Sequence, residues 1–267
     1  MLMAVKNQIK VSFLSIKYAL LREMLNKTTF ITNIIFMILN NASFIIQWII
    51  LYSLQGNVGG YTFDQVLLLW GLAAGTYGVS RFFFQKAFSL SDTINNGKLD
   101  AYLVQPKNVL LSVITSEVQV SAIGDILYAY IMLLIYGFTI PRFILFTIFC
   151  LGGGIMLTSI SIILSSLSFW FQKTDIVADT GNSLMTNFAT YPDGIFKGLV
   201  KILLFTLIPV GIINYIPVHI LSEFSLGLSL IFILVTILLT GLAILVFYKG
   251  LKRYSSSNLM TARIWGG

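Results

Sequence analysis

The stretch "LGLSLIFILVTILLTGLAILVFY", residues 226–248, contains no charged side chain. A helix needs about 20 predominantly apolar residues to cross a bilayer, so this stretch predicts a membrane span. The rest of the 267-residue chain has a similar character, because 57% of all residues are hydrophobic and only 10% are charged. An average soluble domain has roughly 25% charged residues. The sequence therefore predicts a single all-α integral membrane domain over residues 1–267.

Other apolar segments predict further spans. The first covers about residues 28–54, the second 63–84, the third 109–138 and the fourth 143–171. Residues 4–24 differ, because apolar side chains recur there at steps of three and four while the lysines lie largely off that stripe. This pattern indicates an amphipathic helix, and its lysines suit the anionic inner surface of a bilayer. We expect this helix to lie in the membrane interface before the first span.

Basic residues gather near both ends of the chain. They are Lys6, Lys10, Lys17, Arg22 and Lys27 near the start, and Lys249, Lys252, Arg253 and Arg263 near the end. Because cytoplasmic segments carry an excess of Lys and Arg, both termini are expected in the cytoplasm, which requires an even number of spans. The net charge is +7, but no basic face with interleaved aromatic residues lies outside the apolar segments. A nucleic-acid partner is therefore not expected.

The fifth span has two alternatives. Either the apolar segment 198–217 crosses while the more polar segment 175–192 lies on the inner surface, or 175–192 crosses and the later segment dips into the outer leaflet and returns. The distribution of basic residues favours the first alternative, because the second places two lysines outside. Pro209 and Pro217 favour the second, because they interrupt the backbone hydrogen bonding that a lipid-exposed helix needs. Both alternatives give six spans.

Amide side chains recur within the first predicted span. Asn26, Asn33, Asn40 and Gln47 follow one another at heptad spacing, and Asn41 lies beside them. Seven residues are close to two helical turns, so these amides share one face of the helix. Amides at this depth need partners or water. The stripe is either a hydrogen-bonded seam between packed helices or a wet or dimer-facing wall of a transport path.

Two carboxylates fall within the third predicted span. Glu117 is near its inner end and Asp125 is deeper. Ionisable residues inside a membrane are candidates for function. Eight residues correspond to about 80° around a helix, so the two carboxylates need not share a site. Pairing with Arg81 or with an interfacial lysine is an alternative to a role in ion coupling.

No catalytic constellation is present in the sequence. His219 is the only histidine and Cys150 the only cysteine, so a nucleophile–base pair, a disulfide and a cysteine metal site are not expected. The dipeptide Gly97-Lys98 lacks both the earlier glycine and the following Ser or Thr of a phosphate-binding loop. Any ATP-driven work would therefore need another subunit.

Several stretches resemble, in order, the signature stretches of a bacterial family of ATP-binding-cassette type-2 permeases. They are "GGYTFDQVLLLWGLAAGTYGVSRFFF" (59–84), "TINNGKLDAYLVQPKN" (93–108), "FATYPDGIFKG" (188–198), "LIPVGIINYIPV" (207–218) and "FYKGLKRYSSSN" (247–258). The most specific pieces are the run Ile94, Gly97, Asp100, Leu103, Pro106, the Tyr191-Pro192 pair, and the Tyr-Ile-Pro after Asn214.

The resemblance implies the type-2 exporter fold. That fold has six transmembrane helices, an amphipathic elbow helix (here 4–24), a cytoplasmic coupling helix after the second span (within 85–108), and an outer re-entrant hairpin before the last span (193–218). It therefore favours the second alternative for the fifth span. The hairpin residues would be Tyr191, Pro192, Pro209 and Pro217. Asp193 departs from the family pattern, which tends to have a small or apolar residue there.

The resemblance also implies partners. These are two copies of a cytoplasmic ATPase that binds ATP and Mg, a second permease subunit, identical or similar, and membrane lipids. Residues expected to dock on the ATPase, by anchors in an apolar groove and by charges that fix the register, are Phe88, Leu90, Ile94, Gly97, Lys98, Leu99, Asp100, Tyr102 and Pro106. Residues expected at the translocation path or dimer seam are Asn33, Asn40, Asn41 and Gln47.

The function that follows is a non-catalytic permease subunit in a bacterial cell membrane. It would export an amphipathic substrate such as a peptide, lipid or drug, with energy from the separate ATPase. One alternative is a non-transporting module that senses a compound and signals through the ATPase. Another is an ion-coupled secondary transporter, although the sequence has no inverted pair of broken helices.

Overall fold

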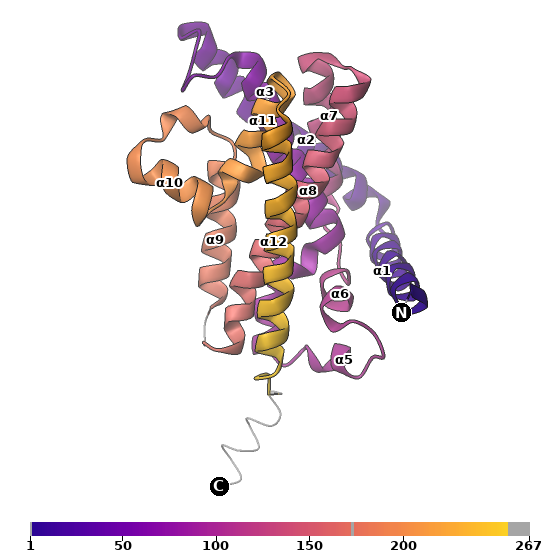
Figure 1. Ribbon diagram of the computed structural model, residues 1–267. Coiled ribbons are helices and arrows are strands. Elements are labelled where there is room, and N and C mark those ends of the chain that lie inside the picture. Colours follow the sequence, from indigo (N-terminus) through magenta and orange to yellow (C-terminus); the bar gives the residue numbers. More distant parts are fainter. Residues whose placement is uncertain (1, 172–173, 256–267) are drawn as a thin grey trace.

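A computed structural model describes residues 2–171 and 174–255, and that part of the chain is helical with no strand (Figure 1). The helices are α1 (Leu2–Glu23), α2 (Lys27–Leu54), α3 (Phe63–Phe84), α4 (Leu90–Asn95), α5 (Asp100–Leu103), α6 (Val109–Ile114), α7 (Ser121–Gly137), α8 (Ile140–Ser166), α9 (Asp175–Phe188), α10 (Gly198–Thr206), α11 (Ile216–Ser222) and α12 (Leu226–Leu251). Short turns are η1 (Gln85–Ser89), η2 (Leu167–Phe169), η3 (Asp193–Ile195) and the π-helical η4 (Gly211–Tyr215).

Four helical stretches are long and apolar enough to cross a membrane. Within residues 2–171 and 174–255 they are Lys27–Leu54, Phe63–Asn95, Ile140–Phe169 and Leu226–Leu251, and a bent helix pair at Gly198–Ser222 gives a fifth if it is one span. α7 is a shorter apolar helix. The prediction of an all-α, multi-pass membrane protein is confirmed at this level.

Helix α3 lies at the centre of the bundle and packs mainly against α7 and α8. Gly71 and Gly75 allow the close approach, since a Cβ at these positions would lie 3.0 Å from the Cβ of Met132 and 3.1 Å from that of Ala129. Small residues let helix backbones approach closely in a membrane, where packing rather than the hydrophobic effect drives association. α12 packs on the other side of α8.

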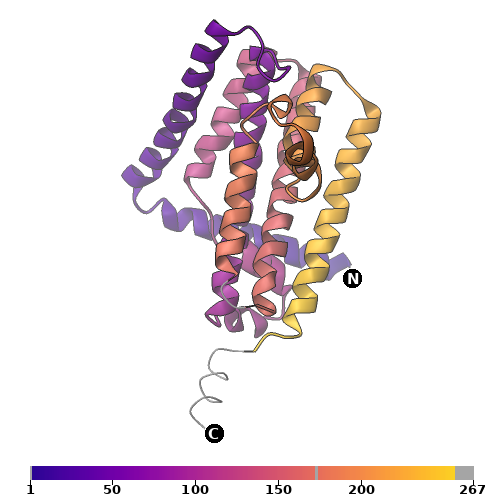
Figure 2. The same cartoon turned by 90° about the vertical axis from the view of Figure 1, so that its left-hand side faces the viewer.

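Helix α1 runs across the other helices (Figure 2). It buries Ile16 and Ala19, while Phe13 is 64% exposed. The side chain of Gln8 accepts a hydrogen bond from the backbone N–H of Asn108, 2.9 Å away, so α1 is tied to the start of α6. This orientation fits a helix that lies in the membrane interface.

The third predicted span, 109–138, is wrong as a continuous helix. The chain interrupts it at residues 115–120, between α6 and α7, and Glu117 lies in this break rather than in a helix. Contacts with residues 81–86 stabilise the non-helical conformation of this break. The N–H of Gln119 donates to the carbonyl of Arg81 at 3.2 Å, and the ammonium of Lys86 lies 2.6 Å from the Glu117 carboxylate.

Residues 193–222 leave the bundle and rejoin it at the same end. At one end, Gly194 packs so closely on Gly59 that a Cβ would lie 1.9 Å from the Gly59 carbonyl oxygen. At the other end, the amide of Gln65 donates to the Ser222 hydroxyl at 3.4 Å. The chain bends by 77° between α10 and the following helical stretch, Gly211–Ser222. α9 contacts α4 and η1 at the opposite end and leads up to this segment (Figure 1).

We predict that cysteines at Gln55, Lys197 and Phe224 react with a membrane-impermeant maleimide from one side of the membrane, and a cysteine at Asn95 from the other. All four positions are exposed, whereas the native Cys150 is buried and contributes little background. Labelling is measured in sealed vesicles of both orientations. Reaction of the residue-197 cysteine from the side opposite to residue 55 would contradict the fold.

Candidate functional site

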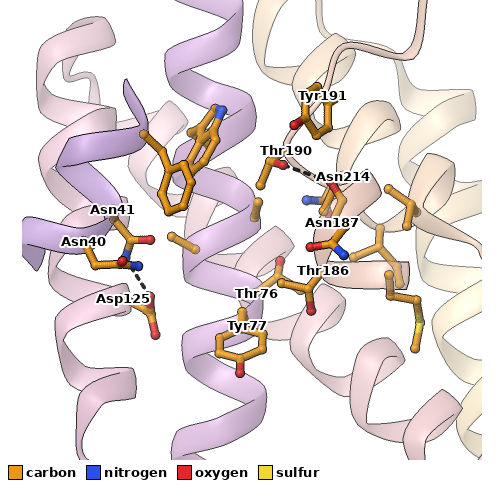
Figure 3. A pocket seen from close by; sticks show the side chains of 18 of the residues that line it. Asn40, Asn41, Thr76, Tyr77, Asp125, Thr186, Asn187, Thr190, Tyr191 and Asn214 are labelled. Atoms are coloured by element: carbon orange, nitrogen blue, oxygen red, sulfur yellow. Dashed lines mark hydrogen bonds between the residues drawn. The ribbon is translucent and has the colours of Figure 1, made fainter. Parts of the chain in front are cut away.

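A cavity of about 530 Å³ lies among α2, α3, α9 and the turn η4, with Leu157 of α8 in its wall. Figure 3 shows polar side chains of these segments around it. The polar and aromatic residues that line it are Asn40, Asn41, Phe44, Gln47, Trp48, Trp70, Thr76, Tyr77, Asp125, Thr186, Asn187, Thr190, Tyr191 and Asn214. No basic residue lines the cavity within the described part of the chain.

The amide stripe of the first span supplies one wall. Asn40, Asn41 and Gln47 line the cavity, whereas Asn33 is exposed outside it. Asn26 caps α2 by accepting a hydrogen bond from the N–H of Thr29. The expectation of one continuous polar face is therefore met only by the members deeper in the helix.

Residues after the fourth predicted span supply the opposite wall, and of these only Tyr191 is among the predicted site residues. Thr186 and Asn187 lie on α9, and Tyr191 follows that helix. Asn214 in η4 is 1% exposed, and its Nδ2 has no hydrogen-bond partner among the described residues. The polar residues scattered through segment 175–192 indicate that part of this segment avoids lipid, but they do not show which residues face α2.

The predicted hairpin residues lie around this end of the cavity. Tyr191 is 49% exposed, and its ring lies 6.0 Å from that of Trp48. Pro192 precedes η3 and Pro209 precedes η4, and at these turns a missing N–H removes no interior helical bond. Pro217 is instead the second residue of α11 and lies inside the continuous helical stretch Gly211–Ser222, directly after the π-helical η4.

Asp125 joins α7 to α2 at the edge of the cavity. Its side chain is 3% exposed, and Oδ1 accepts a hydrogen bond of 2.7 Å from the Asn41 amide (Figure 3). Oδ2 has no partner among the described residues. Glu117, in contrast, lies away from the cavity and pairs with Lys86. The two carboxylates thus occupy separate places, which their sequence spacing allowed.

The cavity offers groups that can bind a ligand. Amides and hydroxyls offer hydrogen bonds, and Phe44, Trp48 and Trp70 offer aromatic surface. Pockets of this kind suit a ligand that is partly polar and partly apolar. Within the described residues, no three His, Cys, Asp or Glu side chains lie together as a metal site would require.

The loop 85–108 corrects part of the docking expectation. Phe88, Leu90, Ile94 and Leu99 are 6%, 0%, 6% and 0% exposed, so they cannot be the surface that enters a partner. They belong to the protein's own core, where η1 and α4 pack on α8. The guanidinium of Arg81 lies 3.8 Å from the centre of the Phe88 ring, a distance that allows a cation–π contact.

The largest exposed apolar side chains of this loop lie at its tip, residues 102–107. Leu103 and Val104, which are not among the predicted docking residues, are 41% and 83% exposed, and Pro106 and Lys107 beside them are exposed too. Gly97 has φ of +69°, a left-handed conformation that favours glycine, and it turns the chain between α4 and α5.

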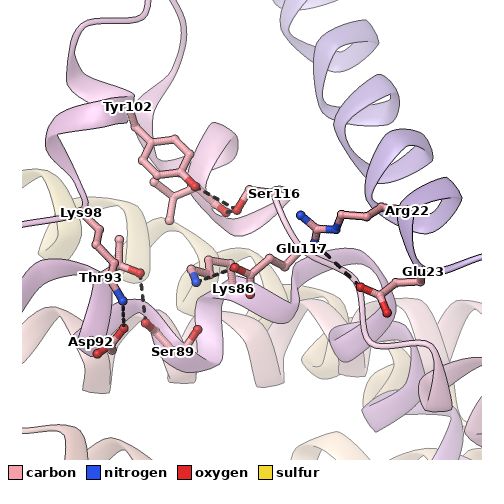
Figure 4. Close-up of polar contacts among 11 residues, drawn as sticks. Arg22, Glu23, Lys86, Ser89, Asp92, Thr93, Lys98, Tyr102, Ser116 and Glu117 are labelled. Carbon is pink, nitrogen blue, oxygen red and sulfur yellow. Dashed lines mark hydrogen bonds and ion pairs between the residues drawn. The ribbon is translucent and has the colours of Figure 1, made fainter. Parts of the chain in front are cut away.

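Polar contacts hold the tip on the bundle (Figure 4). The Tyr102 hydroxyl donates to Ser116 in the break of the third span at 3.1 Å. Lys98, which is exposed, pairs with Asp92 within the same loop at 2.9 Å.

The loop also lies near the residues that follow α12. Burial raises the pKa of Tyr254, beyond the end of α12, and the half-buried carboxylate of Asp100 raises this pKa further.

Comparison with known proteins gives one match. The model of a family described as "ABC-2 family transporter protein" matches residues 34–258, a range that contains every residue lining the cavity and the whole loop 85–108. No curated protein and no solved structure matched the chain.

Replacing Asn41 by Leu should lower the free energy of unfolding by about 1 kcal/mol, the scale of interhelical hydrogen bonds in membrane proteins. The reason is that the change leaves Asp125 without its amide donor. Unfolding in detergent measures the loss. Asn33→Leu is the matched control, because Asn33 is an exposed amide on the same helix outside the cavity. Equal losses in both variants would contradict a stabilising role of the pair.

Proposed function

The chain belongs to the ABC-2 transporter family, and we propose that it is the membrane-spanning permease subunit of an ATP-driven exporter. The observation that carries the proposal is the cavity between α2 and α9, which combines amides, hydroxyls and aromatic rings inside an apolar helical bundle. Such a lining suits an amphipathic peptide, lipid or drug. The subunit itself is non-catalytic, and ATP and Mg belong to a separate ATPase.

We propose six spans, formed by α2, α3, α6 with α7, α8, α9 and α12. The segment 193–218 is then a re-entrant hairpin on the outer side, because both ends of the excursion contact residues 59–65. The loop 85–108 and both termini are cytoplasmic, in agreement with their basic residues. The membrane is the bacterial plasma membrane.

A second permease subunit, identical or similar, would complete the transport path. In this chain alone, the amides of Asn40 and Gln47 are exposed in the middle of a mostly apolar helix. Amides in contact with lipid are costly, whereas amides facing a partner or water are satisfied. The proposal therefore puts α2 and α9 at the seam between two permease subunits.

The cytoplasmic tip is the proposed dock for the ATPase, so that two permease subunits bind two copies of the ATPase. Leu103, Val104 and Pro106 are apolar or rigid residues on an exposed turn, and an apolar groove of a partner could bury them. Movement of the tip would reach the cavity through two hydrogen bonds. In one, the Tyr102 hydroxyl donates to Ser116 in the break before α7. In the other, the Asn41 amide at the cavity wall donates to Asp125 of α7.

Changing Leu103 and Val104 together to Asp should weaken co-purification with the ATPase by at least about tenfold, because burying unpaired carboxylates in an apolar groove is costly. Phe224→Asp is the matched control, since it is an exposed apolar residue at the other end of the bundle. Leu99→Asp should unfold the protein instead, since Leu99 is 0% exposed. Full retention of the ATPase by the double variant would refute the dock.

Transport is tested in proteoliposomes that contain the chain and its ATPase. The account predicts ATP-dependent movement of at least one labelled lipid, amphipathic peptide or amphipathic dye without an ion gradient. Ala73→Phe, which puts a phenyl ring into the cavity, should reduce movement, whereas Leu242→Phe on the exposed face of α12 should not. Transport driven by an ion gradient alone would indicate a secondary transporter. Binding without transport would indicate a sensor.

A further inference from the structure

A second hollow, of about 350 Å³, lies between α1 and the segment 102–116. It is separate from the cavity between α2 and α9, since the two share no lining residue. One wall comes from residues 11–15 of α1, and the other comes from the loop tip and α6. The hydrogen bond from the N–H of Asn108 to the Gln8 side chain also joins α1 to the start of α6.

Three buried donors at this hollow have no acceptor among the described residues, whereas Tyr102, Gln105, Thr115 and Ser116 donate hydrogen bonds within the protein. The hydroxyls of Ser12 and Ser112 and the amide nitrogen of the adjacent Gln8 are buried and have no hydrogen-bond partner among the described residues. Lys107 also lines the hollow, and its ammonium is in none of the ion pairs of the described residues. No carboxylate lines the hollow within that part of the chain. This set of groups suits an anion with several oxygen acceptors, such as a phosphate.

The hollow also has an apolar side, which a free phosphate would not use. Val11 and Leu14 line it, and Leu14 is 38% exposed. Leu111, next to Ser112 on α6, is 36% exposed. α1 lies across the bundle, in the orientation of an interfacial helix (Figure 2), so this site would be at the level of the lipid headgroups.

We propose that the hollow between α1 and α6 binds the phosphate group of an anionic phospholipid. The serine hydroxyls and Lys107 contact the phosphate, while the acyl chains leave along Val11 and Leu14. An anionic lipid is favoured over a zwitterionic one, because no carboxylate is present to pair with a choline or ethanolamine group. The bound lipid would tie α1 to the loop tip that carries Tyr102. This proposal needs only the membrane location and is independent of the transported substrate.

The test is native mass spectrometry of the purified protein with phosphatidylglycerol or phosphatidylcholine of the same acyl length. The wild type should retain phosphatidylglycerol with about fivefold preference, the scale of one lysine near an anionic membrane surface. The variant Lys107→Gln with Ser112→Ala should lose this preference. Lys252→Gln, a change of an exposed lysine at the end of α12, should keep it. Ser12→Ala with Ser112→Ala, which removes no charge, should also weaken binding.

Two outcomes would overturn the proposal. One is equal retention of the two lipids by the wild type, or a preference that is unchanged in both site variants. The other is displacement of phosphatidylglycerol by inorganic phosphate alone at millimolar concentration, which would make the site a phosphate site rather than a lipid site. Size-exclusion chromatography of each variant verifies that it remains folded.

Discussion

The structure depends on one constraint, that backbone N–H and C=O groups inside a hydrocarbon layer must find partners within the protein. Continuous helices meet it over α2, α3, α8 and α12. Where the helix is interrupted, turns and other parts of the chain provide the partners. At the break 115–120, the carbonyl of Arg81 accepts a hydrogen bond from the N–H of Gln119. Within the segment 193–222, local turns supply backbone partners, such as the Leu203 carbonyl for the N–H of Ile208, and contacts with residues 59–65 anchor both ends of the segment. Both interruptions border the surfaces to which we assign function.

The same constraint applies to side chains and accounts for the cavity. Among the amides of α2, Asn41 finds a side-chain partner in Asp125, while Asn40 and Gln47 face the space between α2 and α9. Because covering an amide without giving it a hydrogen-bond partner costs free energy, these amides oppose close apolar packing of α2 against α9. Asp125 of α7 accepts a hydrogen bond from Asn41 at the cavity wall. Ser116, in the break just before α7, accepts a hydrogen bond from Tyr102 at the cytoplasmic tip. The cavity wall and the tip are therefore connected through α7.

Features that depend on local pattern could be read from the sequence. The second span was expected at 63–84 and α3 is Phe63–Phe84, and the first was expected at 28–54 and α2 is Lys27–Leu54. The break in the third span could not be read, because it depends on contacts with Arg81 and Lys86, which lie far away in the chain. Likewise, the sequence cannot distinguish an apolar residue that binds a partner from one, such as Leu99, that is buried in the protein's own core. Asn214 was missed because its cavity is assembled from distant segments.

The central claim is that the space between α2 and α9 is a water-accessible path within the membrane. Single cysteines at Asn40, Gln47 and Thr186, compared with cysteines at Ile35 and Ile46, test it most directly through their rates of reaction with a charged methanethiosulfonate in native membranes. All five positions are exposed in the single chain, but only the first three line the cavity. The account predicts fast reaction at these three and slow reaction at the two isoleucine positions. Equal rates on both sets, or no reaction at the cavity positions, would contradict it.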